Sequence, residues 1–326
     1  MTTSATSASK AHSRIGLYGM PLVLLLLGVA ASVWWLVASS LAEKEFDQAI
    51  AAEASRGRAW SCGERSIGGF PFRIEAECRQ AKLIILGERP ITITASRVMA
   101  LSQIYQPRLM LIEIAAPLSL VSSEGHSTDM NWSIFRASVH LETPVTADRI
   151  SLEAKDVVIK STAQNETAHL AQIETHIRKR PVETGTPIDV EFAADVAKAS
   201  LDSIAGAPLD AHIAGRINQG VALLERSGTN AIETWRKADG KLILDQLTVN
   251  RGEQNLNVTG TISLDEQRRP TGKVDVAATG LRDLLKEIGM GQLADMMAGD
   301  VRLPLTMTKG RLLLGPLKLA DLQPLY

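Results

Sequence analysis

The sequence predicts an α+β protein made predominantly of antiparallel β-meander sheets with a few packing helices, preceded by one N-terminal transmembrane helix. Three observations predict this fold class. Residues 15–42 carry no charge, apolar and polar side chains alternate at period two in many later segments, and short turn-rich links such as 250–253 join those segments. Alternation with one apolar face is typical of an antiparallel sheet whose other face is wet.

The uncharged run is long enough to cross a membrane. It has 28 residues, whereas a helix of about 20 residues spans a hydrocarbon core. Lys10 and Arg14 precede it without an acidic residue, and Glu43 follows it. The positive-inside rule therefore predicts a cytoplasmic tail over 1–14, a signal anchor over 15–42 and an exported region over 43–326.

A cleaved signal peptide is the alternative. Ser40-Leu41-Ala42 resembles a small-x-small cleavage site. The apolar core of a signal peptide has about 7–15 residues, shorter than this run, so an uncleaved anchor is favoured. Cleavage after Ala42 stays open.

Composition excludes several classes of protein. The formal net charge is −1, and 45% of residues are hydrophobic against 22% charged. This balance argues against a general nucleic-acid binder, which carries a basic excess, and against a disordered chain.

Two cysteines, Cys62 and Cys78, follow the predicted anchor and enclose 15 residues. Export places them in an oxidising compartment, so we expect a structural disulfide worth about 3 kcal/mol by loop-closure entropy. Two buried thiols are the alternative. A catalytic or metal role would need Cys-x-x-Cys spacing or a nearby His, and the closest downstream His is His126.

The segment between the cysteines alternates at period two and predicts a strand over 70–78. Its expected buried face carries Phe70, Phe72, Ile74, Ala76 and Cys78, and its wet face carries Glu75 and Glu77.

Similar alternation predicts further strands over 82–86, 91–95, 109–114, 150–159, 242–249, 255–264, 273–278, 301–308 and 311–319. Helical spacing predicts helices over 43–56, 191–204, 221–238 and 281–297. Pro181, Gly185 and Pro187 suggest a boundary between an exported β-rich region, 43–186, and a helical connector with a C-terminal meander, 187–326.

No motif for catalysis, cofactor binding or metal binding stands out. The histidines lack metal-ligand spacing, and Gly289-Met290-Gly291-Gln292-Leu293-Ala294 matches a dinucleotide fingerprint in letters only, because no strand precedes it. We therefore expect a protein that is not an enzyme, without catalytic, cofactor or metal residues. The histidines are His12, His126, His140, His169, His176 and His212.

Three blocks resemble a known family: Trp60-Ser61-Cys62, Gly69-Phe70-Pro71-Phe72-Arg73, and Cys78. They are similar to the N-terminal signature of a Gram-negative envelope family called domain of unknown function 2125, as are Trp235–Gly240 and Gly315-Pro316-Leu317 further on. The resemblance implies a β-rich protein that is anchored in the inner membrane and faces the periplasm, with no established activity. More distantly, the strand pattern resembles AsmA-type envelope proteins, which are associated with lipid transport.

The leading functional prediction is an envelope protein whose sheet binds a lipid or another apolar ligand. The alternatives are a structural or assembly factor that binds another membrane protein, and an unrecognised hydrolase. Expected partners are the inner-membrane bilayer and a lipid or envelope protein, but no nucleic acid and no cofactor. Periodicity leaves open whether the apolar face is a groove or a closed core.

Overall fold

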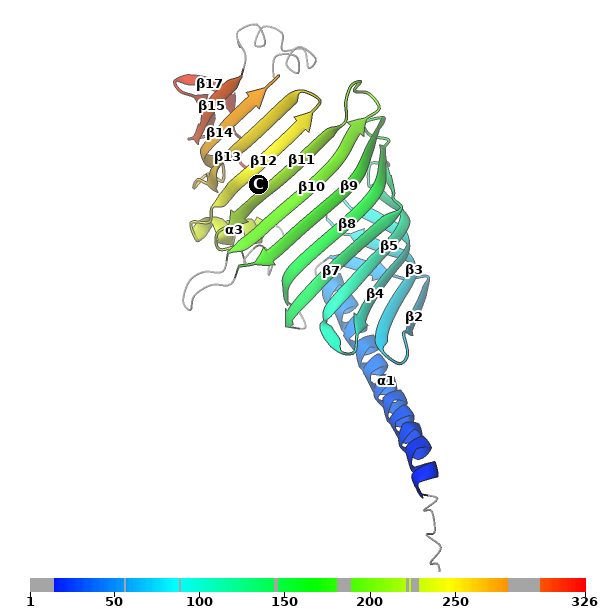
Figure 1. Cartoon of the computed structure of the whole chain (residues 1–326). Helices are drawn as coiled ribbons and strands as arrows, with labels where there is room; N and C mark the ends of the chain where they lie inside the picture. Colours follow the sequence, from blue (N-terminus) through cyan, green and yellow to red (C-terminus); the bar gives the residue numbers. More distant parts are fainter. Residues whose placement is uncertain are drawn as a thin grey trace, which may run out of the picture.

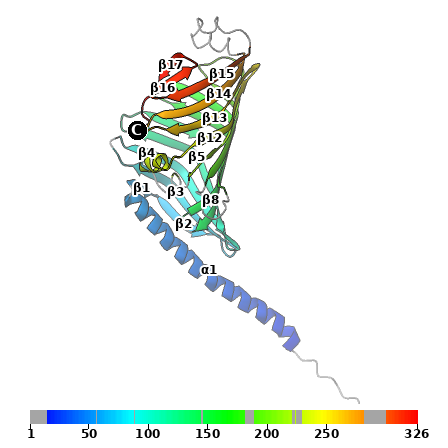
Figure 2. The same ribbon diagram turned by 90° about the vertical axis from the view of Figure 1, so that its left-hand side faces the viewer.

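The computed structural model describes residues 15–55, 57–87, 89–143, 146–180, 189–220, 223, 229–280 and 300–326. Over these residues a long helix leads into one antiparallel sheet of 17 strands, and a short helix lies inside its curve (Figures 1 and 2). The elements are α1 Ile15–Ser55, β1 Arg58–Ser61, β2 Glu64–Gly68, β3 Arg73–Ile85, β4 Ile91–Gln103, β5 Gln106–Ser122, β6 Ser127–Asn131, β7 Ile134–Thr143, β8 Thr146–Ser161, β9 Glu166–Lys179, β10 Val190–Leu201, β11 Leu209–Ile217, α3 Thr229–Lys237, β12 Leu242–Arg251, β13 Gln254–Leu264, β14 Pro270–Thr279, β15 Val301–Thr308, β16 Arg311–Leu314 and β17 Leu317–Asp321.

The sheet is a continuous meander in which nearly every strand pairs with the next one in sequence. β1 and β2 both pair with β3, and β6 and β7 together fill the position between β5 and β8. The predicted fold class, mainly antiparallel sheet after a long apolar helix, is confirmed. The boundary suggested at residue 187 falls between β9 and β10, which pair along their length, so the sheet continues across it.

The two faces of the sheet have opposite chemistry, as period-two alternation requires. Phe192 of β10 is paired with Ile177 of β9, which is paired in turn with Ile150 of β8. One residue along, Glu191 is paired with Arg178, and their side chains form a 2.6 Å ion pair. Figure 2 shows the sheet curving strongly, so one face is a concave apolar surface and the other a convex polar one.

Helix α1 has two parts. Its described side chains from Tyr18 to Ala31 lie exposed or nearly so, whereas Trp35, Ala42, Phe46 and Ile50 form a half-buried stripe. This stripe faces the first strands (Figures 1 and 2), where the Arg65 guanidinium lies 5.5 Å from the Phe46 ring centre. Within the described residues this is one helix long and apolar enough to cross a membrane, and it continues through 43–55 as predicted.

Most of the predicted strands are confirmed. The strand predicted over 311–319 is instead two paired strands, β16 and β17, because the chain turns at Gly315, which has a φ of 57°. The predicted helix over 191–204 is wrong. This segment is β10, because it pairs on both sides with β9 and β11, and two ladders of backbone hydrogen bonds outweigh the helix propensity of its alanines. Of the helix expected over 221–238, α3 occupies Thr229–Lys237. The helix expected over 281–297 lies outside the described residues.

The prediction that Phe70 and Phe72 lie on a buried strand face is also wrong. β3 begins at Arg73, and both rings lie in the turn before it, 56% and 71% exposed. Gly69 has a φ of +98° and a β-carbon there would lie 2.6 Å from the Arg73 carbonyl oxygen. The chain reverses at this glycine, so the apolar alternation does not continue back to Phe70.

Candidate functional site

An apolar cavity of about 510 Å³ lies on the concave face, at the end where β10 finishes and β11 begins. Strands from β8 to β14 all contribute to it, which only the inside of a curved sheet permits. Its volume falls in the range of ~300–1,000 Å³ that is usual for small-molecule sites. Its lining is Ile159, Ala168, Leu170, Ala199, Ser200, Leu201, Ile204, Ala207, Leu209, Val249, Arg251, Gln254, Asn255, Leu256, Ala278 and Thr279.

Cross-strand pairing places these aliphatic side chains together. Ile159 is paired with Ala168, which is paired with Leu201. Leu256 is paired with both Val249 and Ala278. Residues paired directly opposite one another in a sheet share a face, so two apolar rows form the floor of the cavity.

Two irregular positions help to bend the sheet near this floor. Asp156 of β8 and Lys198 of β10 have left-handed backbone angles, with φ of 53° and 50°. The register of β10 on β11 shifts between Val196 and Ala199, next to Lys198. Bulges of this kind increase local twist and bend a strand, which gives the apolar face its concave shape.

Arg251 fixes the segment that forms the rim of the cavity. Its Nε donates to the Ala207 carbonyl at 3.1 Å and its Nη2 donates to the Ala205 carbonyl at 2.6 Å. The residue between them, Gly206, has a φ of +121°, and a β-carbon there would lie 2.7 Å from Nη2. The guanidinium therefore holds the rim in one shape. It is the only ionisable side chain among the described residues of the lining.

The other end of the same strands is covered by α3. Trp235 of α3 is 8% exposed, and its Nε1 donates to the Asn218 carbonyl at 2.8 Å. Gly240 packs flat against the indole, because a β-carbon there would lie 2.2 Å from Nε1. The helix is thereby locked onto the chain between β11 and β12.

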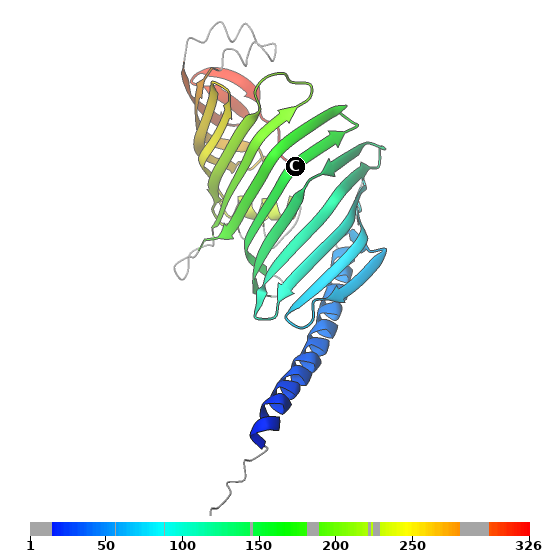
Figure 3. The ribbon, with the colours of Figure 1, turned by 45° about the vertical axis from the view of Figure 1, so that its right-hand side comes forward.

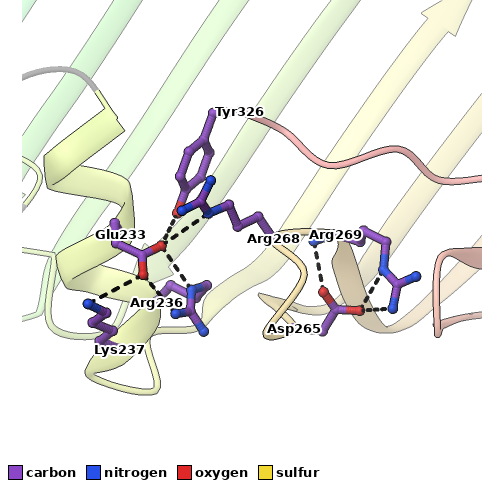
Figure 4. A network of polar contacts seen from close by, with 7 residues as sticks. All are labelled: Glu233, Arg236, Lys237, Asp265, Arg268, Arg269 and Tyr326. Carbon is purple, nitrogen blue, oxygen red and sulfur yellow. Dashed lines mark hydrogen bonds and ion pairs between the residues drawn. The ribbon is translucent and has the colours of Figure 1, made fainter.

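A polar network ties the C-terminal segment to α3 (Figure 4). The Tyr326 hydroxyl donates to Oε2 of Glu233 at 2.7 Å, and Arg236 donates to both Glu233 oxygens. The Arg268 guanidinium carbon lies 4.9 Å from the centre of the Tyr326 ring. The hydrogen bonds from Arg236 and then Tyr326 lower the pKa of Glu233 to about 2. These surface contacts hold the C-terminal residue against α3.

Comparison with known proteins places the chain in a family. The sequence profile of the family described as "Uncharacterized protein conserved in bacteria (DUF2125)" matches residues 35–323. The chain belongs to the DUF2125 family. No curated protein and no solved structure matches the chain. The resemblance to AsmA-type proteins stays a prediction.

The cysteines of this DUF2125 protein are joined in a disulfide between the segment after β1 and the middle of β3. Cys78 is 7% exposed and packs with Ala81 and Ala95, and half-buried Leu118 covers the group. The bridge thus lies on the concave face, at the opposite end of the sheet from the cavity.

None of the described histidines of the DUF2125 protein is among the residues that line the cavity. His140 is paired with Asp148 at 2.6 Å and His212 with Asp195 at 2.7 Å, all on the polar face. His169 contacts Asp202 at 3.1 Å, and His176 contacts Ser151 at 3.0 Å. In the part of the chain that the structure describes, no group of three or more His, Cys, Asp or Glu side chains could hold a metal ion. Gly289–Ala294 lies outside that part.

Sequence reasoning missed the cavity as a site. Period-two alternation identifies the apolar face but contains no information on how far the sheet curves. A usable signal was the small residues Ala168, Ala199 and Ala207 on that face, because small side chains leave a hollow where larger ones would fill it.

Proposed function

We propose that this chain is a single-pass inner-membrane protein whose periplasmic sheet binds the acyl chain of a lipid in the concave cavity. The role is one of binding, not catalysis. Its partners are the bilayer and the bound lipid. The observation that carries the proposal is the aliphatic cavity spanning β8 to β14.

The exposure of the lining supports a ligand site over a closed core. Leu201 is 39% exposed and Ile204 is 49% exposed, although both belong to the lining. None of the described large side chains is completely buried. Aliphatic surface exposed to water is unfavourable by roughly 25 cal/mol per Å², so covering it favours the binding of an apolar ligand.

The orientation follows from the charges around the anchor. Lys10 and Arg14 precede the apolar run and Glu43 follows it. Positive residues stay on the cytoplasmic side, which supports a periplasmic position for the sheet.

Native mass spectrometry of the full chain, extracted from membranes, tests the binding. We expect a mass excess that matches a phospholipid or fatty acid. Ala199→Phe fills the cavity and should abolish the excess. Ala193→Phe, on the opposite face of the same strand, should leave it unchanged. A ligand-free mass for the unsubstituted chain would contradict the proposed lipid binding.

A photoactivatable phospholipid with a diazirine in its acyl chain gives a second measurement. Crosslinked peptides should come from β9 to β13 on the concave face. Equal labelling of Ala199→Phe and the unsubstituted chain would contradict the proposed site.

One observation favours an assembly role as a second candidate. β17 pairs only with β16 among the described residues, and its Leu317 and Leu319 are 60% and 45% exposed. An unpaired edge with apolar side chains can accept a strand from another protein. A photocrosslinker at Leu319 in intact membranes should then capture one stoichiometric partner, and its absence would remove this candidate.

A further inference from the structure

Four aromatic side chains lie exposed near one end of the first strands: Trp34 on α1, Phe70 and Phe72 in the β2–β3 turn, and Tyr105 in the β4–β5 turn. Figure 3 shows α1 passing beside this end of the sheet. Trp34 is 52% exposed, Phe70 56%, Phe72 71% and Tyr105 69%. We call these four residues the aromatic edge. Large aromatic rings gathered on a surface usually mark a contact with a protein or a membrane.

Contacts between the three segments hold the aromatic edge together. The rings of Trp35 and Phe70 pack edge to face with their centres 5.6 Å apart. Nε1 of Trp35 donates to the Arg73 carbonyl at 3.0 Å, and the amide of Ile104 donates to the Phe72 carbonyl at 3.0 Å. The turn that carries Phe70 and Phe72 is thus fixed to the helix on one side and to the Tyr105 turn on the other.

The helix fixes the height of this edge relative to a bilayer. Residues 15–34 number 20, and at 1.5 Å per residue they span roughly 30 Å, the thickness of the hydrocarbon core. The half-buried stripe that faces the sheet begins at Trp35. Placing residues 15–34 across the hydrocarbon core puts the headgroup layer at Trp34 and Trp35, the level at which Phe70 contacts the helix.

We infer that the aromatic edge inserts into the headgroup layer and holds this end of the sheet against the bilayer. Its four residues are Trp34, Phe70, Phe72 and Tyr105. The inference rests on the membrane anchor of the proposed function, but not on a ligand in the cavity. Trp and Tyr are the side chains enriched at membrane interfaces, because each has an apolar ring and a polar group. The exposed Arg108, three residues after Tyr105, adds a cation at headgroup level.

Insertion of the aromatic edge into the headgroup layer would restrict rotation of the sheet relative to the bilayer. β3 runs away from the aromatic edge for 13 residues, up to roughly 40 Å at about 3.3 Å per residue. The cavity lies at that far end of the strands, so lipid exchange would take place away from the bilayer surface.

Site-specific photocrosslinking of the full chain tests the inference. Benzoylphenylalanine replaces Phe72 or Tyr105, and the protein is placed in vesicles of phosphatidylethanolamine and phosphatidylglycerol. Leu86, 61% exposed at the far end of β3, is the matched control, and Leu25, 64% exposed within α1, reports on the anchor itself. Adducts are read by mass spectrometry of the digested protein.

We expect lipid adducts at Phe72 and Tyr105 in yields similar to Leu25 and at least tenfold above Leu86. The inference would be overturned if Leu25 gave lipid adducts but the adduct yields at Phe72 and Tyr105 did not exceed the yield at Leu86. That result would still support α1 as a membrane anchor. If Leu25 also gave no lipid adducts, both the membrane anchor and the insertion of the aromatic edge would be contradicted.

The same variants can be crosslinked in intact membranes. A protein adduct in place of a lipid adduct at Phe72 would assign the aromatic edge to a protein partner and overturn the inference.

Discussion

The Tyr326 hydroxyl donates a 2.7 Å hydrogen bond to Glu233, which lies 93 residues earlier on α3. The contact closes a loop of chain that includes β12 to β17, the C-terminal part of the sheet. Glu233 also pairs with Arg236 of the same helix at 2.8 Å, so the Tyr326 hydroxyl and the Arg236 guanidinium both stabilise its ionised form.

The first prediction concerns pH. The pKa of Glu233 is lowered from 4.5 to about 2. A lowered pKa means that the folded state favours the carboxylate, so its stabilisation is complete above pH 4.5 and is lost as the pH falls through 2. In urea unfolding, the stability difference between the unsubstituted chain and Glu233→Gln should stay constant above pH 5 and shrink between pH 4.5 and 2.

Tyr326→Phe removes one of the partners of Glu233 and leaves its cationic partners, Arg236, Lys237 and Arg268, in place. Without the hydroxyl, the pKa of Glu233 should rise toward its ordinary value, although Arg236 still lowers it. The loss of stabilisation should still begin near pH 4.5, where the unfolded chain titrates, but it should be complete at a higher pH than in the unsubstituted chain and be smaller in total. An identical pH profile for Tyr326→Phe would show that the Tyr326 hydroxyl does not contribute to this pKa.

The second prediction concerns the packing of α3. Trp235→Ala removes a buried indole and should destabilise the protein by about 3–5 kcal/mol. Trp235→Phe keeps most of the ring but leaves the Asn218 carbonyl without its donor, which costs about 1 kcal/mol. Urea unfolding followed by circular dichroism measures both. If both variants lost the same free energy of unfolding, the ring and the hydrogen bond of Trp235 would not contribute separately, and the prediction would be wrong.

The third prediction concerns the disulfide. Cys62 and Cys78 are 16 positions apart, so removing the bridge should cost about 3 kcal/mol by loop-closure entropy. Cys62→Ser with Cys78→Ala tests this, since alanine suits the buried position. Reducing agent should lower the melting temperature of the unsubstituted chain and leave that of the double variant unchanged. A reductant effect on the double variant would contradict the assignment.

Particular residues show how far the sequence could predict the fold. Leu256, Val258 and Ile262 alternate with polar neighbours, and β13 forms there as predicted. Val190, Phe192 and Val196 alternate equally well in β10, yet the helical spacing of residues 191–204 predicted a helix there. The error arose because both patterns fit one short segment, and only pairing with β9 and β11 decides between them.

The candidate site shows a different limit. The sequence predicted an apolar face, and Val249 and Leu256 of that face line the cavity. The twist and the bulges along the whole sheet decide whether distant parts of this apolar face pack against one another in a closed core. Lys198, with its φ of 50°, illustrates the difficulty, because lysine is not a residue that usually signals a left-handed backbone.

The fourth prediction concerns the rim of the cavity. Arg251→Met keeps the length of the side chain but removes the donors that hold the Ala205 and Ala207 carbonyls. Hydrogen exchange over 202–208 should accelerate at least tenfold, and the fraction of chain that carries ligand in native mass spectra should fall. Arg302→Met, at an exposed position on β15, is the matched control and should change neither. Because the lost contacts lie in a surface segment, the melting temperature should move little. Faster exchange with full ligand retention would mean that the ligand is held by the aliphatic floor alone, and that Arg251 shapes the rim without contributing to binding.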